Sequence, residues 1–428
     1  MAAVLNTRID SRSDTLSPRI PAGLAIVFSV AYAAFSLRRH ANFQTSGFDL
    51  GIFEQAVRGY AHGELPVSDI LGHNLLGEHF SPILAILAPF YRLFPSAETL
   101  LIAQALLLGL SVFPVTRTAI RLLGPMLGTT IGFCYGISWG LHSALAFDFH
   151  EVAFAVPITA FALDAYLRGK LGQAVAIAAS LVLVKEDLGL TVAMLGLLIA
   201  VKPATRRLGL ITAACGLTAT LVSIFVLIPH FRGTSYRFFE AAGSGTGDWF
   251  DSDKIVLVLL VLAPSLFLAL RSPLLLLVLP TLAWRLLSSN LFYWQPDFHY
   301  DAVLMPIVFF ALVHSLTLLR LRRFSTAIAA ALVIAGTVLT TSTRSSVVEN
   351  TDANRAAIAE PARRLLQLIP DGASVAIEND LAPQLTSRAD VHLVGSGRPA
   401  EWTLVYRHRT VPLGQFIASA GPFVLIRN

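Results

Sequence analysis

Acidic residues and histidines recur in a few short clusters along this chain, each beside a long apolar run. The first cluster holds Asp49, in the sequence GFDLGIFEQ, and Glu54, which follows about one helical turn later. A carboxylate held at the mouth of a cavity can act as a general base, which is the functional interpretation of Asp49. Asp49 also precedes a short amphipathic helix predicted over 56–63, so the alternative is that it only caps that helix.

Two further clusters share one pattern. Asp148–Pro157 reads DFHEVAFAVP and Asp297–Pro306 reads DFHYDAVLMP, and each begins an apolar run with an aspartate and a histidine. We expect these four polar residues, Asp148, His150, Asp297 and His299, to converge on one vestibule with Glu78 and His79 of the sequence GEHFSP. Carboxylates and imidazoles can bind a divalent cation, but the spacing matches no tight metal motif and the metal stays unknown. The alternative is that these residues only mark the water interface.

The triplet Lys185-Glu186-Asp187 lies between two apolar runs of about 14 residues, each about 21 Å long as a helix. That length falls short of a hydrocarbon core of about 30 Å, so the triplet is predicted to lie below the membrane surface. Ionisable groups at that depth usually face a cavity and mark a functional site. The alternative is that Lys185 simply neutralises Glu186 or Asp187.

The composition is that of a membrane protein. Of 428 residues, 55% are hydrophobic and 14% charged, with a mean hydropathy of +0.66, whereas soluble domains carry about 25% charged residues. The net charge of +5 is mild. No basic patch interleaved with aromatics occurs, so a nucleic-acid partner is not expected. Cys134 and Cys215 both lie in apolar runs, which predicts neither a disulfide framework nor a thiolate metal site.

Hydropathy predicts an all-α polytopic protein with about 11 transmembrane helices. The candidate spans are 20–37, 100–115, 122–141, 152–167, 208–228, 254–270, 301–319 and 325–341, with shorter ones at 171–184, 188–201 and 273–287. The apolar stretch Ser81–Phe94 is short and holds Pro82 and Pro89, so it is expected to be re-entrant or interfacial. The first run is expected to be retained rather than cleaved as a signal peptide.

The predicted spans divide the chain into three regions. Residues 1–19 are expected to form a cytoplasmic tail, because this orientation places more of the loop arginines and lysines on the cytoplasmic side. Residues 20–341 form the transmembrane domain, whose first external loop is 38–99. Residues 342–428 form a small external α/β domain, with a helix near 353–368 and strands near 374–378, 391–394, 402–406 and 423–427. This domain lacks a phosphate-binding loop, so it is expected to be accessory rather than catalytic.

The chain resembles the bacterial membrane family called domain of unknown function 2079 over nearly its whole length. The matching segments are FDLGIFEQAVR, GEHFSPILAILAPFYRLFPS, DFHEVAFAVP, KEDLGL, DFHYDAVLMP and IPDGASVAIENDLAPQLTSR. That family in turn resembles the GT-C membrane glycosyltransferases, which take a sugar from a polyprenyl-phosphate donor on the external face. Many of these enzymes place an Asp-Glu pair in the first external loop. Here Asp49 matches the first acid, while Leu50 replaces the second and Glu54 is the nearest substitute.

The resemblance implies an inverting glycosyltransferase of the bacterial inner membrane, with its N-terminus cytoplasmic and its C-terminal domain external. The implied partners are a polyprenyl-phosphate sugar donor and membrane lipid, with an unknown acceptor and no certain cofactor beyond a candidate divalent cation. The candidate catalytic residues are Asp49, Glu54, Glu186 and Asp187. The cations expected to hold the donor phosphate are Arg58, Lys185, Arg232 and Arg285, since guanidinium and ammonium groups suit phosphate.

Two other classes of function remain open at this stage. A transporter or flippase of a lipid-linked or small solute would also use an intramembrane charged triplet. The nearly featureless cytoplasmic loops argue against it, because a transporter needs polar access from both sides. An assembly protein whose external domain recruits a partner is the third possibility.

Overall fold

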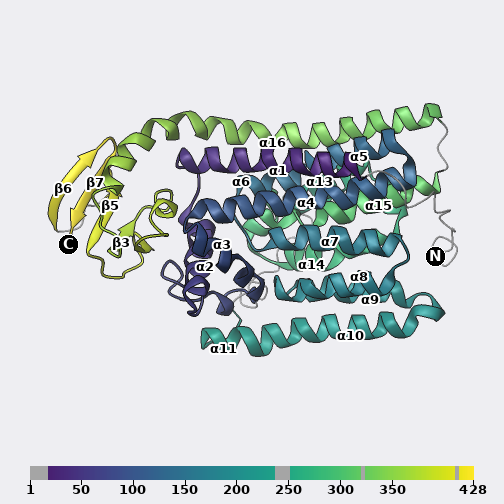
Figure 1. Cartoon of the computed structure of the whole chain (residues 1–428), viewed down its shortest axis with the longest axis horizontal. Coiled ribbons are helices and arrows are strands. Elements are labelled where there is room, and N and C mark those ends of the chain that lie inside the picture. Colours follow the sequence, from purple (N-terminus) through teal and green to yellow (C-terminus); the bar gives the residue numbers. More distant parts are fainter. Residues whose placement is uncertain (1–17, 237–250, 320–322, 410–413) are drawn as a thin grey trace.

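A computed structural model shows the protein as a bundle of near-parallel helices with a small β-sheet domain beyond one end (Figure 1). The structure describes residues 18–236, 251–319, 323–409 and 414–428. Most of the tail assigned to 1–19 lies outside the described residues, and so does the glycine-rich run at 243–247.

The bundle is built from helices that run back and forth along one axis (Figure 1). They are α1 (Arg19–Ala41), α4 (Ala97–Leu123), α5 (Pro125–Gly136), α6 (Trp139–Ala146), α7 (Val152–Leu167), α8 (Leu171–Ala179), α9 (Leu188–Ala200), α10 (Arg206–Val222), α11 (Ile228–Arg232), α13 (Ser252–Leu262), α14 (Leu279–Leu287), α15 (Leu304–Leu318) and α16 (Arg323–Leu366).

Four stretches of the described residues are long and apolar enough to cross a bilayer: Arg19–Ala41, Ala97–Leu123, Pro203–Arg232 and His299–Leu318. Six shorter apolar helices accompany them. One of these six, Pro273–Leu287, begins as the 3-10 helix Pro273–Val278. Elsewhere, the helical run from α5 to α6 is interrupted at Ile137 and Ser138. The mostly helical membrane class is confirmed, and the count of about eleven spans stays a prediction.

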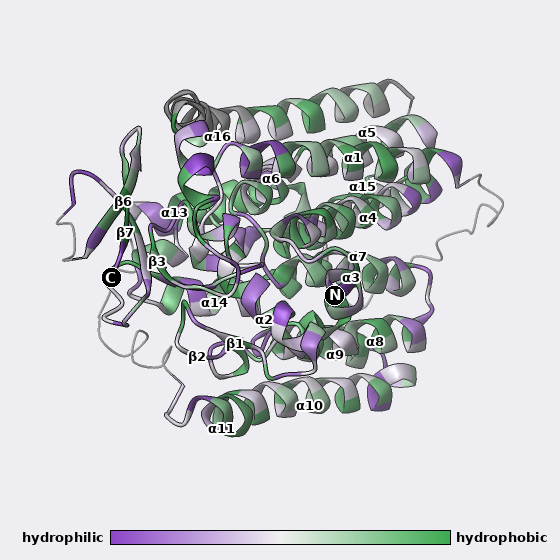
Figure 2. Cartoon of the chain, turned by 60° about the vertical axis from the view of Figure 1, so that its left-hand side comes forward, coloured by the Kyte–Doolittle hydropathy of each residue, from purple (hydrophilic) through white to green (hydrophobic). Residues whose placement is uncertain are grey.

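The bundle has a buried centre and an exposed apolar periphery. The apolar window of His299–Leu318 is 89% buried, whereas that of Pro203–Arg232 is only 28% buried, so α15 is central and α10 peripheral. Hydrophobic residues colour the helices along their length, while hydrophilic residues gather around α2 and on parts of the sheet domain (Figure 2). This pattern is what a bilayer around the bundle requires.

Helices α9 and α10 approach each other at glycines. A Cβ added to Gly196 would lie 2.4 Å from the backbone nitrogen of Ala213, and one added to Gly216 would lie 2.4 Å from the carbonyl oxygen of Gly189. Small residues allow such close backbone contact, which is the usual way helices associate in a membrane. The charged triplet Lys185–Asp187 immediately precedes α9.

The connection between α1 and α4 contains short elements at the end of the bundle nearest the sheet domain (Figure 1). They are the kinked turn η1 (Gly47–Gly51), α2 (Ile52–His62), β1 (Val67–Ser68), β2 (His73–Asn74), η3 (Pro82–Leu87) and α3 (Ala88–Leu93). The helix α2 ends at Gly63, whose φ of 79° is the left-handed conformation favoured by glycine. The region Ser81–Phe94 is split into two short helical pieces, as its prolines predict, and is too short to cross a bilayer.

The C-terminal domain is a five-stranded sheet of order β4-β3-β5-β7-β6. Its strands are β3 (Ser374–Ile377), β4 (Asp390–Leu393), β5 (Trp402–Tyr406), β6 (Gln415–Ala420) and β7 (Phe423–Arg427). β3 pairs in parallel with β4 and β5, and β7 pairs antiparallel with β5 and β6. The expected small sheet domain is confirmed. The strand missed from sequence is β6, an edge strand with no buried residue.

The expected boundary between 341 and 342 falls inside a helix. The helix predicted near 353–368 is the end of α16, which continues without a break from Arg323 to Leu366. The second half of this helix is polar, and that change in composition suggested a separate element. A helix that leaves a membrane no longer needs an apolar face, but its backbone hydrogen bonds can continue unbroken. One helix therefore joins the bundle to the sheet domain.

Candidate active site

A cavity of about 540 Å³ lies at the sheet-domain end of the bundle. Its polar lining consists of Asp49, Glu78, His79, His150, Lys185, Glu186, Asp187, Thr220, Ser288, Asn290 and His299. Its aromatic lining consists of Phe48, Phe53, Phe147, Tyr236, Trp284, Phe292, Tyr293, Phe298 and Tyr300. The structure therefore brings most of the sequence-predicted polar clusters together, although they come from distant parts of the chain.

Asp49 projects from a strained turn. Its φ of 86° and ψ of −83° lie in a region that L-residues rarely adopt, and the flanking Phe48 is extended. Its Oδ1 is 3.8 Å from Nε2 of His150. Burial, together with the nearby carboxylates of Asp148 and Glu151, raises the pKa of Asp49 to about 7, against a lowering effect of Lys185 and His79.

The helix-capping alternative for Asp49 is wrong. The N-cap of α2 is Gly51, and within the described part of the chain no side-chain hydrogen bond caps that helix. A residue in a strained conformation without a capping role is typical of a functional site, where surrounding contacts hold an unfavourable backbone geometry.

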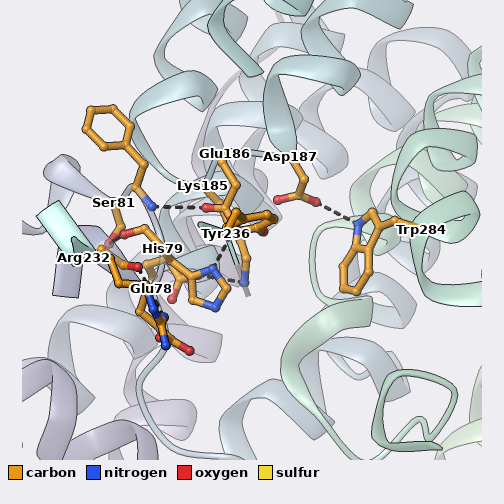
Figure 3. A network of polar contacts seen from close by, with 12 residues as sticks. Glu78, His79, Ser81, Lys185, Glu186, Asp187, Arg232, Tyr236 and Trp284 are labelled. Atoms are coloured by element: carbon orange, nitrogen blue, oxygen red, sulfur yellow. Dashed lines mark hydrogen bonds and ion pairs between the residues drawn. The ribbon is translucent and has the colours of Figure 1, made fainter. Parts of the chain in front are cut away.

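The charged triplet is anchored by partners from four other parts of the chain (Figure 3). Lys185 Nζ lies 3.1 Å from Oε1 of Glu151, so its ion-pair partner is Glu151 rather than either sequence neighbour. Glu186 accepts hydrogen bonds from Tyr236 Oη at 2.6 Å and from the backbone N–H of Phe80 at 3.1 Å, and pairs with His79. The His79 Nδ1 to Glu186 Oε1 distance is 2.8 Å.

Asp187 and Glu78 complete this network (Figure 3). The indole Nε1 of Trp284 donates to Asp187 Oδ2 at 2.9 Å. Glu78 contacts Arg232 and also lies 3.2 Å from His73 Nε2. Arg232 is therefore held by Glu78 at the rim and is not among the lining residues. The acids of this network are engaged by donors, which suits them to position other groups.

The two DFH clusters converge through their histidines. The rings of His150 and His299 stack with centroids 3.4 Å apart and planes inclined by 20°. Nδ1 of His150 contacts the Glu151 carboxylate, which also pairs with Lys185. Both ring nitrogens of His299 are buried and have no hydrogen-bond partner among the described residues, so they can accept or donate to a polar ligand in the cavity.

The aspartates of these two clusters do not line the cavity. Oδ2 of Asp148 accepts a hydrogen bond from the backbone N–H of Ser46 at 2.8 Å, and Asp297 is exposed. In the second cluster the buried acid is Asp301, which pairs with Arg285 and does not line the cavity either. The structure does not bring Asp148 and Asp297 into the lining of the cavity, and their contact with substrate stays a prediction.

Two of the expected phosphate-binding arginines are occupied elsewhere. Arg285 is fully buried, and its Nη1 and Nη2 lie 2.7 Å and 3.1 Å from the two carboxylate oxygens of Asp301. Arg58 donates to the carbonyl oxygens of Thr386 and Ala389 in the sheet domain, at 3.0 Å and 2.9 Å. Of the four candidate cations, Lys185 is the one that lines the cavity.

Glu54 also faces away from the cavity. It is buried in α2, where it accepts hydrogen bonds from Tyr91 Oη at 3.0 Å and from the Thr386 hydroxyl of the sheet domain. Burial raises the pKa of Glu54 to about 7, against the lowering effect of these two donors. The suggestion that Glu54 replaces a second catalytic acid is not supported by this position, which gives it a role in packing.

Several site residues were missed from sequence. The aromatic wall formed by Trp284, Tyr293 and Tyr300 is one, and Arg285 supports it, with its guanidinium carbon 5.4 Å from the centroid of the Tyr300 ring. A dense aromatic run between 284 and 300 was the available signal. Glu151 is another, although it stands within the DFHE sequence.

The described residues contain no group of three or more His, Cys, Asp or Glu side chains arranged to hold a metal ion. The candidate divalent cation therefore has no ligand set in this part of the chain, and it stays a prediction. What the lining does offer is a carboxylate that can take up a proton near neutral pH, an ammonium that can hold an anion, and aromatic faces that can pack on a sugar or an isoprenoid chain.

Two solved structures share the fold of this chain. ArnT from Cupriavidus metallidurans bound to undecaprenyl phosphate superposes with a TM-score of 0.61 at 16% identity, over 94% of this chain and 97% of that one. The apo structure of the same ArnT gives a TM-score of 0.54 at 15% identity, over 94% and 98%. The fold is thus that of ArnT, a GT-C glycosyltransferase.

The family follows from the sequence match. Residues 39–409 match the family described as "Predicted membrane protein (DUF2079)", and the chain belongs to that family. A comparison with curated proteins finds no match.

Proposed function

We propose that this protein is a membrane glycosyltransferase that transfers a sugar from a polyprenyl-phosphate donor to an acceptor hydroxyl, with Asp49 as the general base. The observation that carries the proposal is the cavity itself, which combines the strained, cavity-lining Asp49 with the buried Lys185 and an aromatic wall. The shared fold with ArnT, whose structure holds undecaprenyl phosphate, supports the class of donor.

The proposed chemistry is a single displacement with inversion. The acceptor oxygen attacks the anomeric carbon of the donor while the bond from that carbon to the phosphate oxygen breaks. The hydroxyl proton passes to the Asp49 carboxylate, and the polyprenyl phosphate leaves with its added negative charge stabilised by the Lys185 ammonium. Glu186 and Asp187 are proposed to position His79, Tyr236 and Trp284 around the sugar.

The direct test is donor turnover. Purified full-length protein in lipid nanodiscs, supplied with a panel of undecaprenyl-phosphate sugars and membrane extract as acceptor, should release undecaprenyl phosphate. Failure to release it from every donor, together with movement of a lipid-linked or small solute across proteoliposomes, would support the transporter alternative instead.

The pH dependence of transfer should show the raised pKa of Asp49. Because burial disfavours the carboxylate, Asp49 is mostly protonated below pH 7 and cannot accept a proton there. The value of kcat/KM should therefore rise with pH up to about 7 and level off above it. An acidic limb near pH 4, where an ordinary aspartate titrates, would contradict this assignment.

We also propose that the protein lies in the bacterial inner membrane with its N-terminus cytoplasmic and its sheet domain external. The basic residues of the loops favour this orientation. A reporter that is active only in the cytoplasm should work when fused after Leu319. The same reporter fused to the C-terminus at Asn428 should be silent. Because α16 is continuous, a fusion after Thr341 would interrupt a helix and is a poorer test. Reporter activity of the fusion at Asn428 would place the sheet domain in the cytoplasm and contradict the proposed topology.

A further inference from the structure

The turn that carries Asp49 is held by groups from outside it. The backbone N–H of Ser46 donates to Asp148 at the start of the α7 region. The next two N–H groups both donate to Asn379 of the sheet domain. The Gly47 N–H donates to the Asn379 carbonyl oxygen at 2.6 Å, and the Phe48 N–H donates to the Asn379 side-chain Oδ1 at 2.7 Å. One residue of the sheet domain thus binds the backbone N–H groups of the two residues that precede Asp49.

Close packing at Gly47 shows how tightly this contact is made. A Cβ added to Gly47 would lie 2.6 Å from the Cβ of Ala382 and 3.3 Å from Oδ1 of Asn379. Real side chains do not approach so closely, so the contact depends on glycine at this position. The backbone of the turn therefore lies directly against the sheet domain.

Asn379 itself is placed by a rigid part of that domain. It follows the interior strand β3, which pairs on one side with β4 and on the other with β5. The preceding residue, Glu378, is buried, and its carbonyl oxygen accepts the N–H groups of Leu381 and Ala382. The backbone around Asn379 is therefore fixed independently of the turn it binds.

The segment after Asp49 is fixed to the same domain. Nε2 of Gln55 donates to the carbonyl oxygen of Val391 at 2.7 Å, and Arg58 binds the carbonyl oxygens of Thr386 and Ala389. Asp49 is therefore bracketed by contacts to one rigid body. A rarely adopted backbone conformation persists only where its surroundings enforce it, and these contacts are such surroundings.

From this arrangement we infer that Asn379 is a positioning residue, and that the sheet domain completes the site by holding Asp49 in the cavity. The inference rests on the proposed function for its catalytic consequence, while the structural contact stands by itself. It also revises the expectation that the domain is merely accessory. Without the Asn379 side chain, Phe48 loses its partner, the turn relaxes, and the carboxylate leaves its position beside His150.

The test compares three variants of the full-length protein. Asn379→Leu removes the side-chain acceptor at nearly constant size, and Asn379→Asp keeps an acceptor oxygen. The matched control is Asn428→Leu, because Asn428 is an asparagine of the same domain that bonds to Ala400 and Thr403, far from the turn in sequence and contacts. If Asn379→Leu does not fold, Asn379→Ser, whose hydroxyl is too short to reach Phe48, takes its place.

Hydrogen–deuterium exchange of the peptide spanning 44–50 is the first measurement. Exchange should become faster by on the order of tenfold in Asn379→Leu, the effect of losing one hydrogen bond, and stay at the wild-type rate in Asn379→Asp and Asn428→Leu. Unchanged exchange in Asn379→Leu would overturn the inference, whether or not the protein transfers sugar.

Transfer kinetics are the second measurement. In Asn379→Leu we expect kcat to fall by on the order of tenfold with the donor KM within about twofold, and Asn379→Asp to restore most of it. Faster exchange with unchanged kcat would overturn the positioning role. If the wild-type protein transfers no sugar, the proposed function fails, and the exchange measurement still decides whether Asn379 holds the turn.

Discussion

Replacing Asp49 with asparagine should lower the rate of sugar transfer by about 10²–10⁴-fold, the usual contribution of a positioned general base. Asparagine has nearly the same size and tolerates the positive φ of 86° at this position as well as aspartate does. The variant should therefore fold normally, since Asp49 caps no helix in the described chain. It should still bind undecaprenyl phosphate, because the Lys185 ammonium is untouched.

The measurement is single-turnover transfer, which separates chemistry from donor binding and product release. Asp69→Asn is the matched control, because Asp69 lies in the same connection between α1 and α4 but does not line the cavity. It should transfer at the wild-type rate. A normal rate in Asp49→Asn would exclude Asp49 as the base and direct attention to His150, whose Nε2 lies 3.8 Å from it.

The gathering of Asp49, His150, Lys185 and His299 could be predicted from sequence because each lies at the end of an apolar run. In a polytopic protein such ends lie on one of two faces, and polar groups near the membrane seek one another. The predicted topology places these residues on the same face of the membrane. Hydropathy alone could therefore predict that they share a cavity, without any knowledge of how the helices pack.

Which acid of a cluster points inward was not predictable in this way. Asp297 and Asp301 both stand near His299, and a turn at His299–Asp301 decides between them by rotating Asp301 toward Arg285. The ion pair between Lys185 and Glu151 was likewise not predictable from sequence. It depends on the contact between two segments that are remote in sequence, which charge and spacing do not determine.

The contacts of α2 with the sheet domain could not be predicted from the sequence, for a related reason. Glu54 and Arg58 meet residues more than 300 positions later in the chain, and single-sequence patterns carry no information on such pairings. Their charge suggested catalysis for Glu54 and phosphate binding for Arg58. In the structure both side chains instead form hydrogen bonds across the interface between the bundle and the sheet domain.

Lys185 should contribute both to folding and to donor binding, and the two can be separated. In Lys185→Met the Glu151 carboxylate is left buried without its cation, which typically destabilises a protein by about 3–5 kcal/mol. Thermal unfolding in detergent should show a lower midpoint. Adding Glu151→Gln removes the stranded charge while keeping the shape of the side chain, so the double variant should regain most of the lost stability.

Donor binding should respond differently in these two variants and in the single variant Glu151→Gln. Undecaprenyl phosphate affinity should fall about 10- to 100-fold in Lys185→Met and stay low in the double variant, because a charge-assisted hydrogen bond to phosphate is absent in both. In Glu151→Gln alone the ammonium remains and has no competing carboxylate, so affinity should be at least that of the wild type. If the double variant bound the lipid as tightly as the wild type, Lys185 would serve only to neutralise Glu151. Another group would then have to hold the phosphate. His299 is one candidate, because neither of its buried ring nitrogens has a hydrogen-bond partner among the described residues.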